Sequence, residues 1–119
     1  MRKFANVKSD ESLTKRIIVY ETNTGTYVFP CATLEDGSAT GDYWFENLIQ
    51  ADEFYLDYYS INDDDWQLAN DPQEGCQHDW LAPVRVKADI NSTSIKMERF
   101  ENNQWIEFDH PRATKTSSF

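Results

Sequence analysis

Two runs rich in β-branched and aromatic residues, residues 16–21 and 26–32, stand on either side of the turn sequence Thr22-Asn23-Thr24-Gly25. A short turn that contains glycine between two such runs is typical of a β-hairpin. The pattern therefore predicts an antiparallel strand pair near the start of the chain. Residues 1–14 show only isolated apolar positions, which indicate a loosely attached arm or a short edge strand.

The longest periodic stretch, residues 43–59, predicts a helix with Asp42 as its N-cap. At 100° per residue, one side of this helix is apolar and the other side is polar. The apolar side carries Trp44, Leu48, Ala51, Tyr55, Tyr58 and Tyr59. The polar side carries Asp42, Glu46, Gln50, Glu53 and Asp57, with no lysine among them. Like charges at this spacing destabilise a helix slightly, so the arrangement has no evident structural benefit.

The second half of the chain predicts a loop followed by three strands. Residues 60–75 contain turn-forming Asp, Asn and Pro, and residues 80–88, 94–100 and 105–108 are strand-like runs that should form an antiparallel meander. The expected fold is α+β, with one antiparallel sheet of about five strands, made of the N-terminal hairpin and the C-terminal meander, packed on one central helix. We expect a single domain over residues 15–108 and a frayed tail over residues 109–119.

Charge restricts the kinds of partner. The 119 residues include 11 Lys or Arg and 21 Asp or Glu, which leaves a net charge of −10. This balance opposes binding to nucleic acid and to anionic membranes. The acidity is concentrated in residues 35–79, which hold 13 acidic side chains and no Lys or Arg. We therefore expect neither a nucleic-acid nor a membrane partner.

An acidic run of this kind has two interpretations. It can be a merely solvated surface, which is the commoner case, or a working anionic surface that meets a basic partner. We favour the second, because an unbalanced segment carries a self-repulsion that a neutral surface avoids. The residues expected to bind the partner are Asp42, Glu46, Glu53, Asp57, Asp63, Asp64, Asp65 and Trp66, with Tyr43 as a further aromatic anchor if it is exposed.

A calcium-binding segment is the main alternative. Asp63, Asp65, Gln67, Asp71 and Glu74 occupy the first, third, fifth, ninth and twelfth positions of the twelve-residue calcium loop. The sixth position, which calls for glycine, holds Leu68, and Pro72 interrupts the end of the loop. The pattern thus supports an acidic turn better than a calcium site, and no metal ligand is assigned.

Enzymatic readings have little support. Cys76, His78 and Asp79 lie within four residues, but a zinc site needs three or four converging ligands, and acidic surroundings would raise the pKa of a thiol nucleophile. We expect a structured turn over residues 75–83 in which Trp80 packs. No phosphate-binding loop or nucleophile elbow is present, so we predict a non-enzymatic protein without a cofactor.

Compartment and processing follow from two simple observations. Two cysteines are too few for a disulfide framework, and no cationic-then-apolar segment stands at the start of the sequence. The longest apolar runs have about four residues, far fewer than the roughly 20 that a membrane span requires. We expect a cytoplasmic protein.

Two resemblances point in the same direction. The run Gly75-Cys76-Gln77-His78-Asp79-Trp80-Leu81-Ala82-Pro83-Val84-Arg85-Val86-Lys87, with Asp65-Trp66 and Asp71-Pro72 before it, resembles a segment of small, acidic, uncharacterised bacterial proteins. In size and charge the chain is similar to immunity proteins of bacterial toxin systems, including those of contact-dependent growth inhibition. The second resemblance implies an inhibitor that binds a basic protein toxin, often a nuclease, without catalysis.

Overall fold

The computed structural model describes residues 1–87 and 96–109 of the chain. It divides into two compact units, Met1–Asp71 and Pro72–Phe119, where the sequence predicted one domain over residues 15–108. The first unit contains five strands and the helix α1 (Leu48–Tyr59), and the second contains three strands. The predicted α+β class is therefore confirmed, and an antiparallel sheet of five strands is present, although its strands are not the ones that the sequence assigned to it.

The sheet of the first unit has the strand order β4-β3-β2-β1-β5, and every neighbouring pair is antiparallel. Its strands are β1 (Arg2–Asn6), β2 (Arg16–Thr22), β3 (Gly25–Cys31), β4 (Tyr43–Phe45) and β5 (Gln67–Ala69). The predicted hairpin is confirmed as β2 and β3. The hydroxyl of Thr22 closes its turn, since it accepts from the Thr24 amide at 3.2 Å and donates to the Gly25 carbonyl at 2.7 Å.

The N-terminal residues contribute more than the sequence suggested. β1 lies between β2 and β5 and pairs with both, so the prediction of a loosely attached arm does not hold for Arg2–Asn6. Only Ala5 of this strand belongs to the apolar core, which is why the hydrophobic pattern of the segment is weak. Its backbone hydrogen bonds to two neighbours, rather than its side chains, give β1 its place.

The predicted helix over residues 43–59 is wrong in its first turn. Tyr43–Phe45 form β4, which pairs with Thr26–Val28 of β3, and Asp42 therefore does not cap the helix. α1 begins after Asn47, whose Oδ1 accepts a hydrogen bond from the Gln50 amide at 3.0 Å. Three consecutive aromatic residues favour an extended strand, and pairing with β3 outweighs the helical periodicity.

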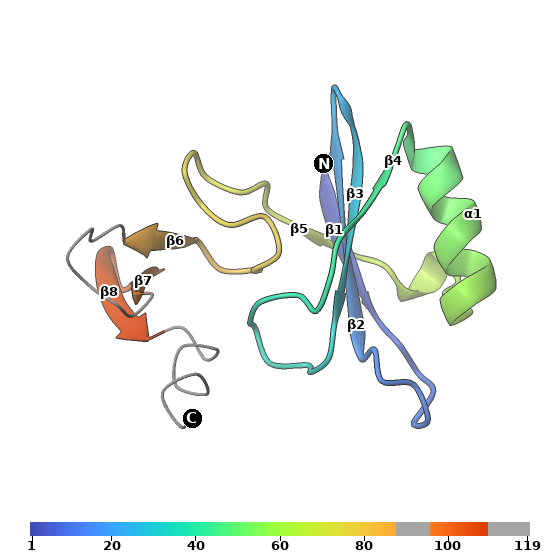
Figure 1. Ribbon diagram of the computed structural model, residues 1–119, viewed down its shortest axis with the longest axis horizontal. Coiled ribbons are helices and arrows are strands. Elements are labelled where there is room, and N and C mark those ends of the chain that lie inside the picture. Colours follow the sequence, from blue (N-terminus) through green and yellow to red (C-terminus); the bar gives the residue numbers. More distant parts are fainter. Residues whose placement is uncertain (88–95, 110–119) are drawn as a thin grey trace, which may run out of the picture. The chain divides into compact units, whose positions relative to one another are not determined.

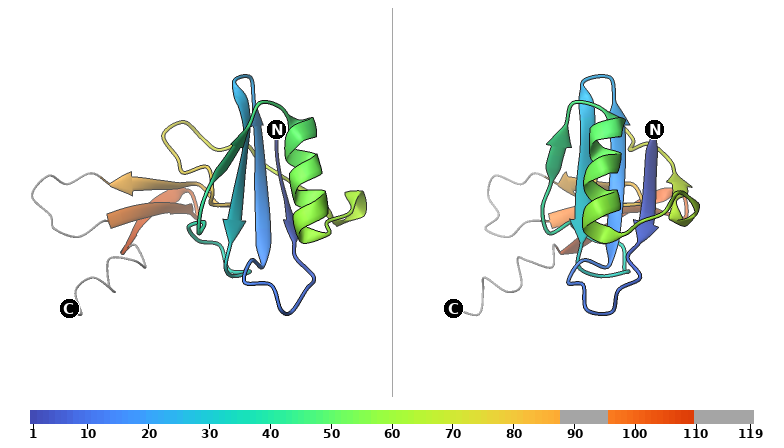
Figure 2. Two further views of the ribbon diagram at one scale, coloured as in Figure 1. Left: turned by 45° about the vertical axis from the view of Figure 1, so that its right-hand side comes forward. Right: turned by 90° about the vertical axis from the view of Figure 1, so that its right-hand side faces the viewer.

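α1 lies along one face of the sheet and closes the main core (Figures 1 and 2). On that face Ala5, Ile17, Val19 and Val28 are fully buried, and Tyr55 of α1 packs on them with 2% of its surface exposed. Because side chains alternate along a strand, Ile18 and Phe29 lie on the opposite face of the sheet, where they are also buried. The helix is thus held by its inner side, and its outer side faces solvent.

The second unit is a three-stranded antiparallel sheet with the order β6-β7-β8. Its strands are β6 (Val84–Lys87), β7 (Lys96–Glu101) and β8 (Gln104–Asp109). The predicted meander forms, but as a sheet of its own and not as part of the five-stranded sheet. Its core joins Trp80, Val84 and Met97 to Phe108. Of the predicted frayed tail, Asp109 ends β8 and residues 110–119 lie outside the described part of the chain.

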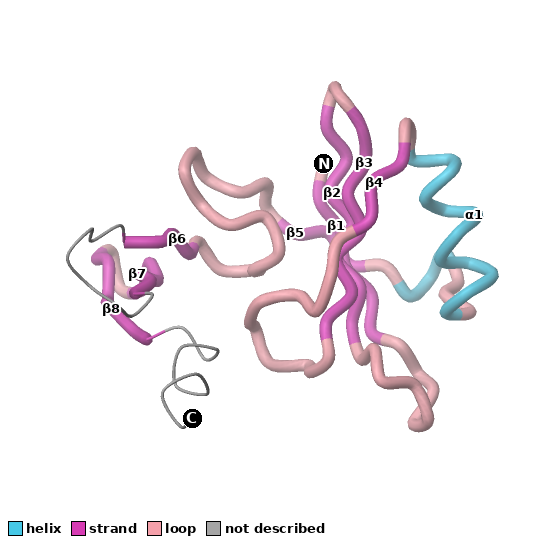
Figure 3. The backbone as a smooth tube through the Cα atoms, viewed as in Figure 1, coloured by secondary structure: helices cyan, strands magenta, loops and turns pink. Residues whose placement is uncertain are grey.

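Long loops connect these elements (Figure 3). Residues 32–42 join β3 to β4, and residues 70–83 join β5 to β6. α1 has 12 residues, and no helix of the described residues is long and apolar enough to cross a membrane.

Gly25, at the start of β3, provides a test of the hairpin. Its φ is +150°, and a Cβ built on it would lie 2.2 Å from Nε1 of Trp44 on the neighbouring edge strand. We expect Gly25→Ala to lower the free energy of unfolding by about 1–3 kcal/mol, because both the backbone and the Trp44 ring must shift. Urea unfolding followed by circular dichroism measures the change.

The matched control is Gly41→Ala, because a Cβ at Gly41 meets nothing within 4 Å. Its stability should stay within about 0.5 kcal/mol of the parent chain. Equal stability of the two variants would show that Trp44 does not pack over Gly25.

Candidate protein-binding surface

Six exposed carboxylates in the segments from Asp42 to Asp64 form the candidate site, which we call the acidic surface. Its members are Asp42, Glu46, Glu53, Asp57, Asp63 and Asp64, and all six are exposed. None of them forms an ion pair with a Lys or Arg of the described residues. They lie just before β4, between β4 and α1, on α1, and in the short 3₁₀ helix η1 (Asp63–Asp65).

α1 fixes the spacing of the central pair. Glu53 and Asp57 are one turn apart, so their Cβ atoms lie about 5–6 Å from each other on the same ridge. Tyr55, between them in sequence, is on the buried side of the helix. The two carboxylates are therefore held on a packed element and point away from the core.

The division of charge between the units is uneven. Residues 1–71 carry five Lys or Arg and 14 Asp or Glu, a net charge of −9. Residues 72–119 carry six and seven, a net charge of −1. Nearly the whole charge of the protein thus belongs to the unit that contains α1.

The five cations of the first unit all lie between residues 2 and 16, and the contacts shown for them go to groups outside the acidic surface. Lys3 Nζ lies 3.6 Å from Asp52, and Lys8 Nζ lies 2.7 Å from Asp65. Arg2 donates to the Asn70 carbonyl, and Lys15 donates to the Asp10 carbonyl. Arg16 donates to Oδ1 of Asn6. Cations of the N-terminal residues, Lys3 in β1 and Lys8 in the loop after it, therefore neutralise Asp52 and Asp65. The six carboxylates of the acidic surface have no such partner among the described residues.

Two residues that the sequence assigned to the partner have internal contacts instead. Asp65 is held by Lys8 and by the backbone amide of Asn62, which donates to its Oδ2 at 3.0 Å. Trp66 is half-buried, packs edge-on against Tyr55 at 4.8 Å, and lies 4.4 Å below Lys3 Nζ. The sequence could not show this, because Lys3 and Lys8 are more than 50 residues away from Asp65 and Trp66 along the chain.

The contact with Lys8 has a measurable effect on Asp65. The hydrogen bond from Lys8 is the largest reason that the pKa of this carboxyl lies below its ordinary value, and the Asn62 amide lowers it further. The ionised form is thus favoured by folding, so this contribution to stability is present above about pH 4 and is lost as the pH falls below that value.

Replacing Lys8 with Met should raise the pKa of Asp65 toward its ordinary value, because the largest stabilising contact of the ionised form is removed. Carbon-13 NMR titration of the Asp65 carboxyl measures this change. Lys15→Met is the matched control, since Lys15 Nζ donates to the Asp10 carbonyl and not to a carboxylate. An unchanged Asp65 pKa in Lys8→Met would contradict the ion pair.

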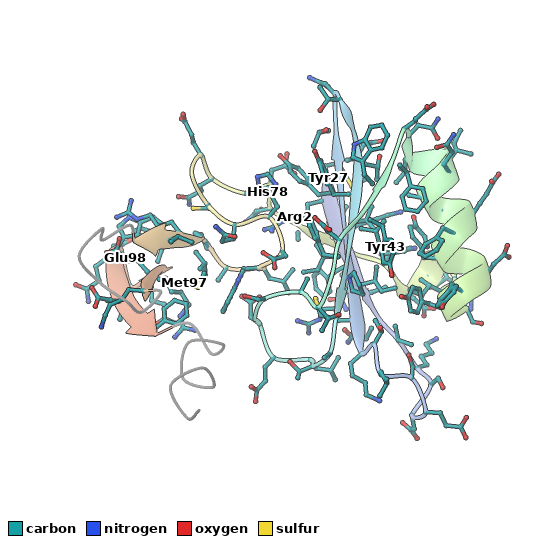
Figure 4. The ribbon with its side chains drawn as sticks, viewed as in Figure 1. Arg2, Tyr27, Tyr43, His78, Met97 and Glu98 are labelled. Carbon is teal, nitrogen blue, oxygen red and sulfur yellow. The ribbon has the colours of Figure 1, made fainter. Side chains whose placement is uncertain are left out.

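An exposed aromatic cluster beside the acidic surface is the feature that the sequence analysis largely missed. Phe54 of α1 lies 5.3 Å from Tyr43 of β4 and 5.4 Å from Tyr58, between ring centroids. Tyr43 and Tyr58 are 47% and 72% exposed, although the helical pattern assigned Tyr58 to the core side. Tyr43 meets the expectation of an exposed aromatic, and Figure 4 shows it on the side of the sheet that faces α1.

No protein family model, characterised protein or solved structure matches the chain.

Glu46 also borders a polar cleft of about 350 Å³. Glu21 and Asn23 at the hairpin turn and Asn47 at the start of α1 line the same cleft. Two carboxylates, Glu21 and Glu46, therefore line one concave space.

The predicted calcium segment adopts a different conformation. Asp63–Asp65 form η1, and Gln67–Ala69 form β5, which pairs with β1. Asp65 is occupied by Lys8, and Asp71 lies 3.4 Å from the N-terminal amine. Strand pairing in the middle of the segment prevents the tight loop that calcium requires. Among the described residues, no group of three or more His, Cys, Asp or Glu side chains is arranged to hold a metal ion.

The Cys76 segment forms a turn that backbone hydrogen bonds hold in place. Cys76 is a buried free thiol, and its amide donates to Gln73 O at 3.0 Å, while the next amide donates to Val84 O at 2.6 Å. Trp80 is buried and packs against Phe108 at 5.7 Å, so the expected turn with a packed Trp80 is confirmed. His78 is exposed on this turn (Figure 4).

Proposed function

We propose that the protein is a non-enzymatic, acidic binding module of the immunity or antitoxin type, which neutralises a basic protein toxin, a nuclease, through the acidic surface. One observation carries this proposal: six carboxylates of the first unit are exposed, while the contacts shown for the cations of this unit go to other groups. A surface with this charge complements a basic patch on another protein.

The physical basis is competition for cationic side chains. A nuclease must present Lys and Arg to the phosphates of its substrate, and a rigid row of carboxylates can occupy the same positions. Glu53 and Asp57 are held by a packed helix, so little conformational entropy is lost when they bind. Electrostatic attraction would mainly accelerate the encounter, and aromatic anchors such as Tyr43 would slow dissociation.

This role is consistent with the charge and with the expected location. A net charge of −9 on the first unit opposes nucleic acid and anionic lipid as partners. A nuclease inhibitor acts where the nucleic acid is, so we assign the protein to the cytoplasm as part of the proposal.

The resemblance to immunity proteins makes the test direct, because such inhibitors are encoded beside their toxins. The reading frame immediately upstream is examined for a basic C-terminal domain; that domain is expressed alone, and its nuclease activity is measured with and without this chain. We expect stoichiometric inhibition, with an association rate that falls as salt is raised. Absence of a basic domain at that position, or association that does not depend on salt, would contradict the proposal.

A further inference from the structure

The aromatic cluster of Tyr43, Phe54 and Tyr58 continues beyond the core. Phe54 also lies 5.3 Å from Phe45 and 6.3 Å from Tyr59, and so connects the cluster to the packed interior. Its outer members are Tyr43 and Tyr58, whose rings are about half and about three-quarters exposed. Exposed aromatic rings that rest on a buried base are typical of anchors for a partner.

Helix geometry places this cluster directly beside the carboxylates. Phe54 and Tyr58 are one turn apart and form one ridge, and Glu53 and Asp57 form the next ridge, about 60–100° further round the helix. Lys3 approaches Asp52 on the opposite flank of α1, so no described cation reaches the aromatic side. The ridge of aromatic rings and the ridge of carboxylates therefore lie side by side on α1.

The same combination of groups, with a cation in place, occurs elsewhere among the described residues. In the first unit, Lys3 Nζ lies 4.4 Å from the Trp66 ring centroid and 3.6 Å from Asp52. In the second unit, Arg85 Cζ lies 3.9 Å from the Trp105 ring centroid, and its Nε donates to Glu98 at 3.0 Å.

We propose that the ridge of Tyr43, Phe54 and Tyr58 receives arginine side chains of the basic partner, which lie on the rings while their guanidinium groups bind Asp57 and Glu53. The inference rests on the proposed function, since it names how a basic partner is held at the acidic surface. It places a cation from outside the chain in the same kind of cation–ring–carboxylate arrangement.

Arginine fits this ridge better than lysine for geometric reasons. A guanidinium is planar, stacks on an aromatic face and presents a fork of donors to a carboxylate, whereas an ammonium is compact and strongly hydrated. Charge alone does not distinguish the two residues. A higher affinity for arginine than for lysine therefore measures the contribution of the rings. The part of the affinity that depends on charge, which is the same for both residues, measures the contribution of the carboxylates.

The experiment titrates the full chain with hexa-arginine and hexa-lysine, both acetylated and amidated, in low salt by isothermal calorimetry. We expect hexa-arginine to bind about three- to tenfold more tightly than hexa-lysine. Tyr43→Leu combined with Tyr58→Leu should abolish this ratio, because both replacements keep apolar bulk but remove the ring. Circular dichroism verifies that the variant is folded.

Tyr27→Leu is the matched control, because Tyr27 lies on the opposite face of the sheet from Tyr43 (Figure 4). It should leave the ratio unchanged. Glu53→Gln combined with Asp57→Asn should weaken both peptides in parallel.

Three results would overturn the inference. Equal affinity for the two peptides, with both weakened by Glu53→Gln and Asp57→Asn, would remove the role of the rings while the acidic surface still binds basic partners. A preference for arginine that persists in the double tyrosine variant would place its origin elsewhere. Binding of neither peptide, or binding that ignores the two carboxylate changes, would overturn the proposed function together with this inference.

Discussion

Replacing Glu46, Glu53 and Asp57 together with lysine is expected to slow association with the basic partner by about 10- to 100-fold at low salt. The change converts three negative charges of the acidic surface into three positive charges, on residues that are exposed and have no described ion-pair partner. Stopped-flow fluorescence, with the tryptophans as reporters, measures the association rate.

The fold should survive this replacement, because none of the three side chains contributes to the core. Glu46 and Gln50 are linked through the Glu46 backbone amide, which a change of side chain does not remove. The effect should shrink as salt is added, since the screening length falls from about 8 Å at physiological ionic strength to about 3 Å at 1 M.

The control changes the net charge by the same amount at another place. Asp10, Glu11 and Glu35 are exposed in the loops that follow β1 and β3, and their triple lysine variant should affect the association rate far less. If the two triple variants slow association equally, net charge and not the acidic surface determines the rate. An unchanged rate in the first variant would remove the surface from the mechanism.

Local patterns predicted those parts of the fold whose partners are close in sequence. The hairpin around Thr22–Gly25 and the turn between β7 and β8 each join adjacent strands, and both runs and turns were readable. At the second turn, Asn102 and Asn103 adopt positive φ values of 52° and 64°, which asparagine tolerates well. Such elements follow from turn chemistry and alternation alone.

The pairing of strands that are distant along the chain could not be predicted from local sequence patterns. Residues 43–45 satisfy a helical period and an aromatic strand equally well, and only the free edge of β3 decides between them. Strand β1 likewise gains its position from pairing with β5, more than 60 residues later in the chain. The assignment of strands to two sheets depended on these contacts, so the sequence predicted one sheet.

In the candidate site, too, the sequence predicted the local features and missed the long-range contacts. Exposure of Asp42, Glu46, Glu53 and Asp57 was predictable from charge and periodicity. The internal roles of Asp65 and Trp66 were not, because they depend on Lys8 and Lys3. Lys3 and Lys8 also reduce the repulsion within this acidic unit, because they neutralise Asp52 and Asp65. Glu53 and Asp57 remain exposed on α1.

The attachment of α1 to the sheet supports every role assigned to the acidic surface, and Tyr55 is its main anchor. Tyr55 is 2% exposed, belongs to the core cluster and packs edge-on against Trp66 at 4.8 Å. Tyr55→Ala should lower the free energy of unfolding by about 3–5 kcal/mol, because it removes a large buried ring and leaves a cavity under the helix. Guanidinium or urea unfolding measures the loss.

Two further variants serve as controls: one removes only the Tyr55 hydroxyl, and the other removes an exposed ring of the same helix. The Tyr55 hydroxyl is buried without a hydrogen-bond partner among the described residues, so Tyr55→Phe should leave stability unchanged or raise it by up to about 1 kcal/mol. Tyr58→Ala, at a side chain that is 72% exposed, should cost less than about 1 kcal/mol. A large loss of stability in Tyr55→Phe would reveal a hydrogen bond to the hydroxyl. A small loss of stability in Tyr55→Ala would mean that other contacts hold α1. The carboxylates would then be less rigid than a preformed binding surface requires.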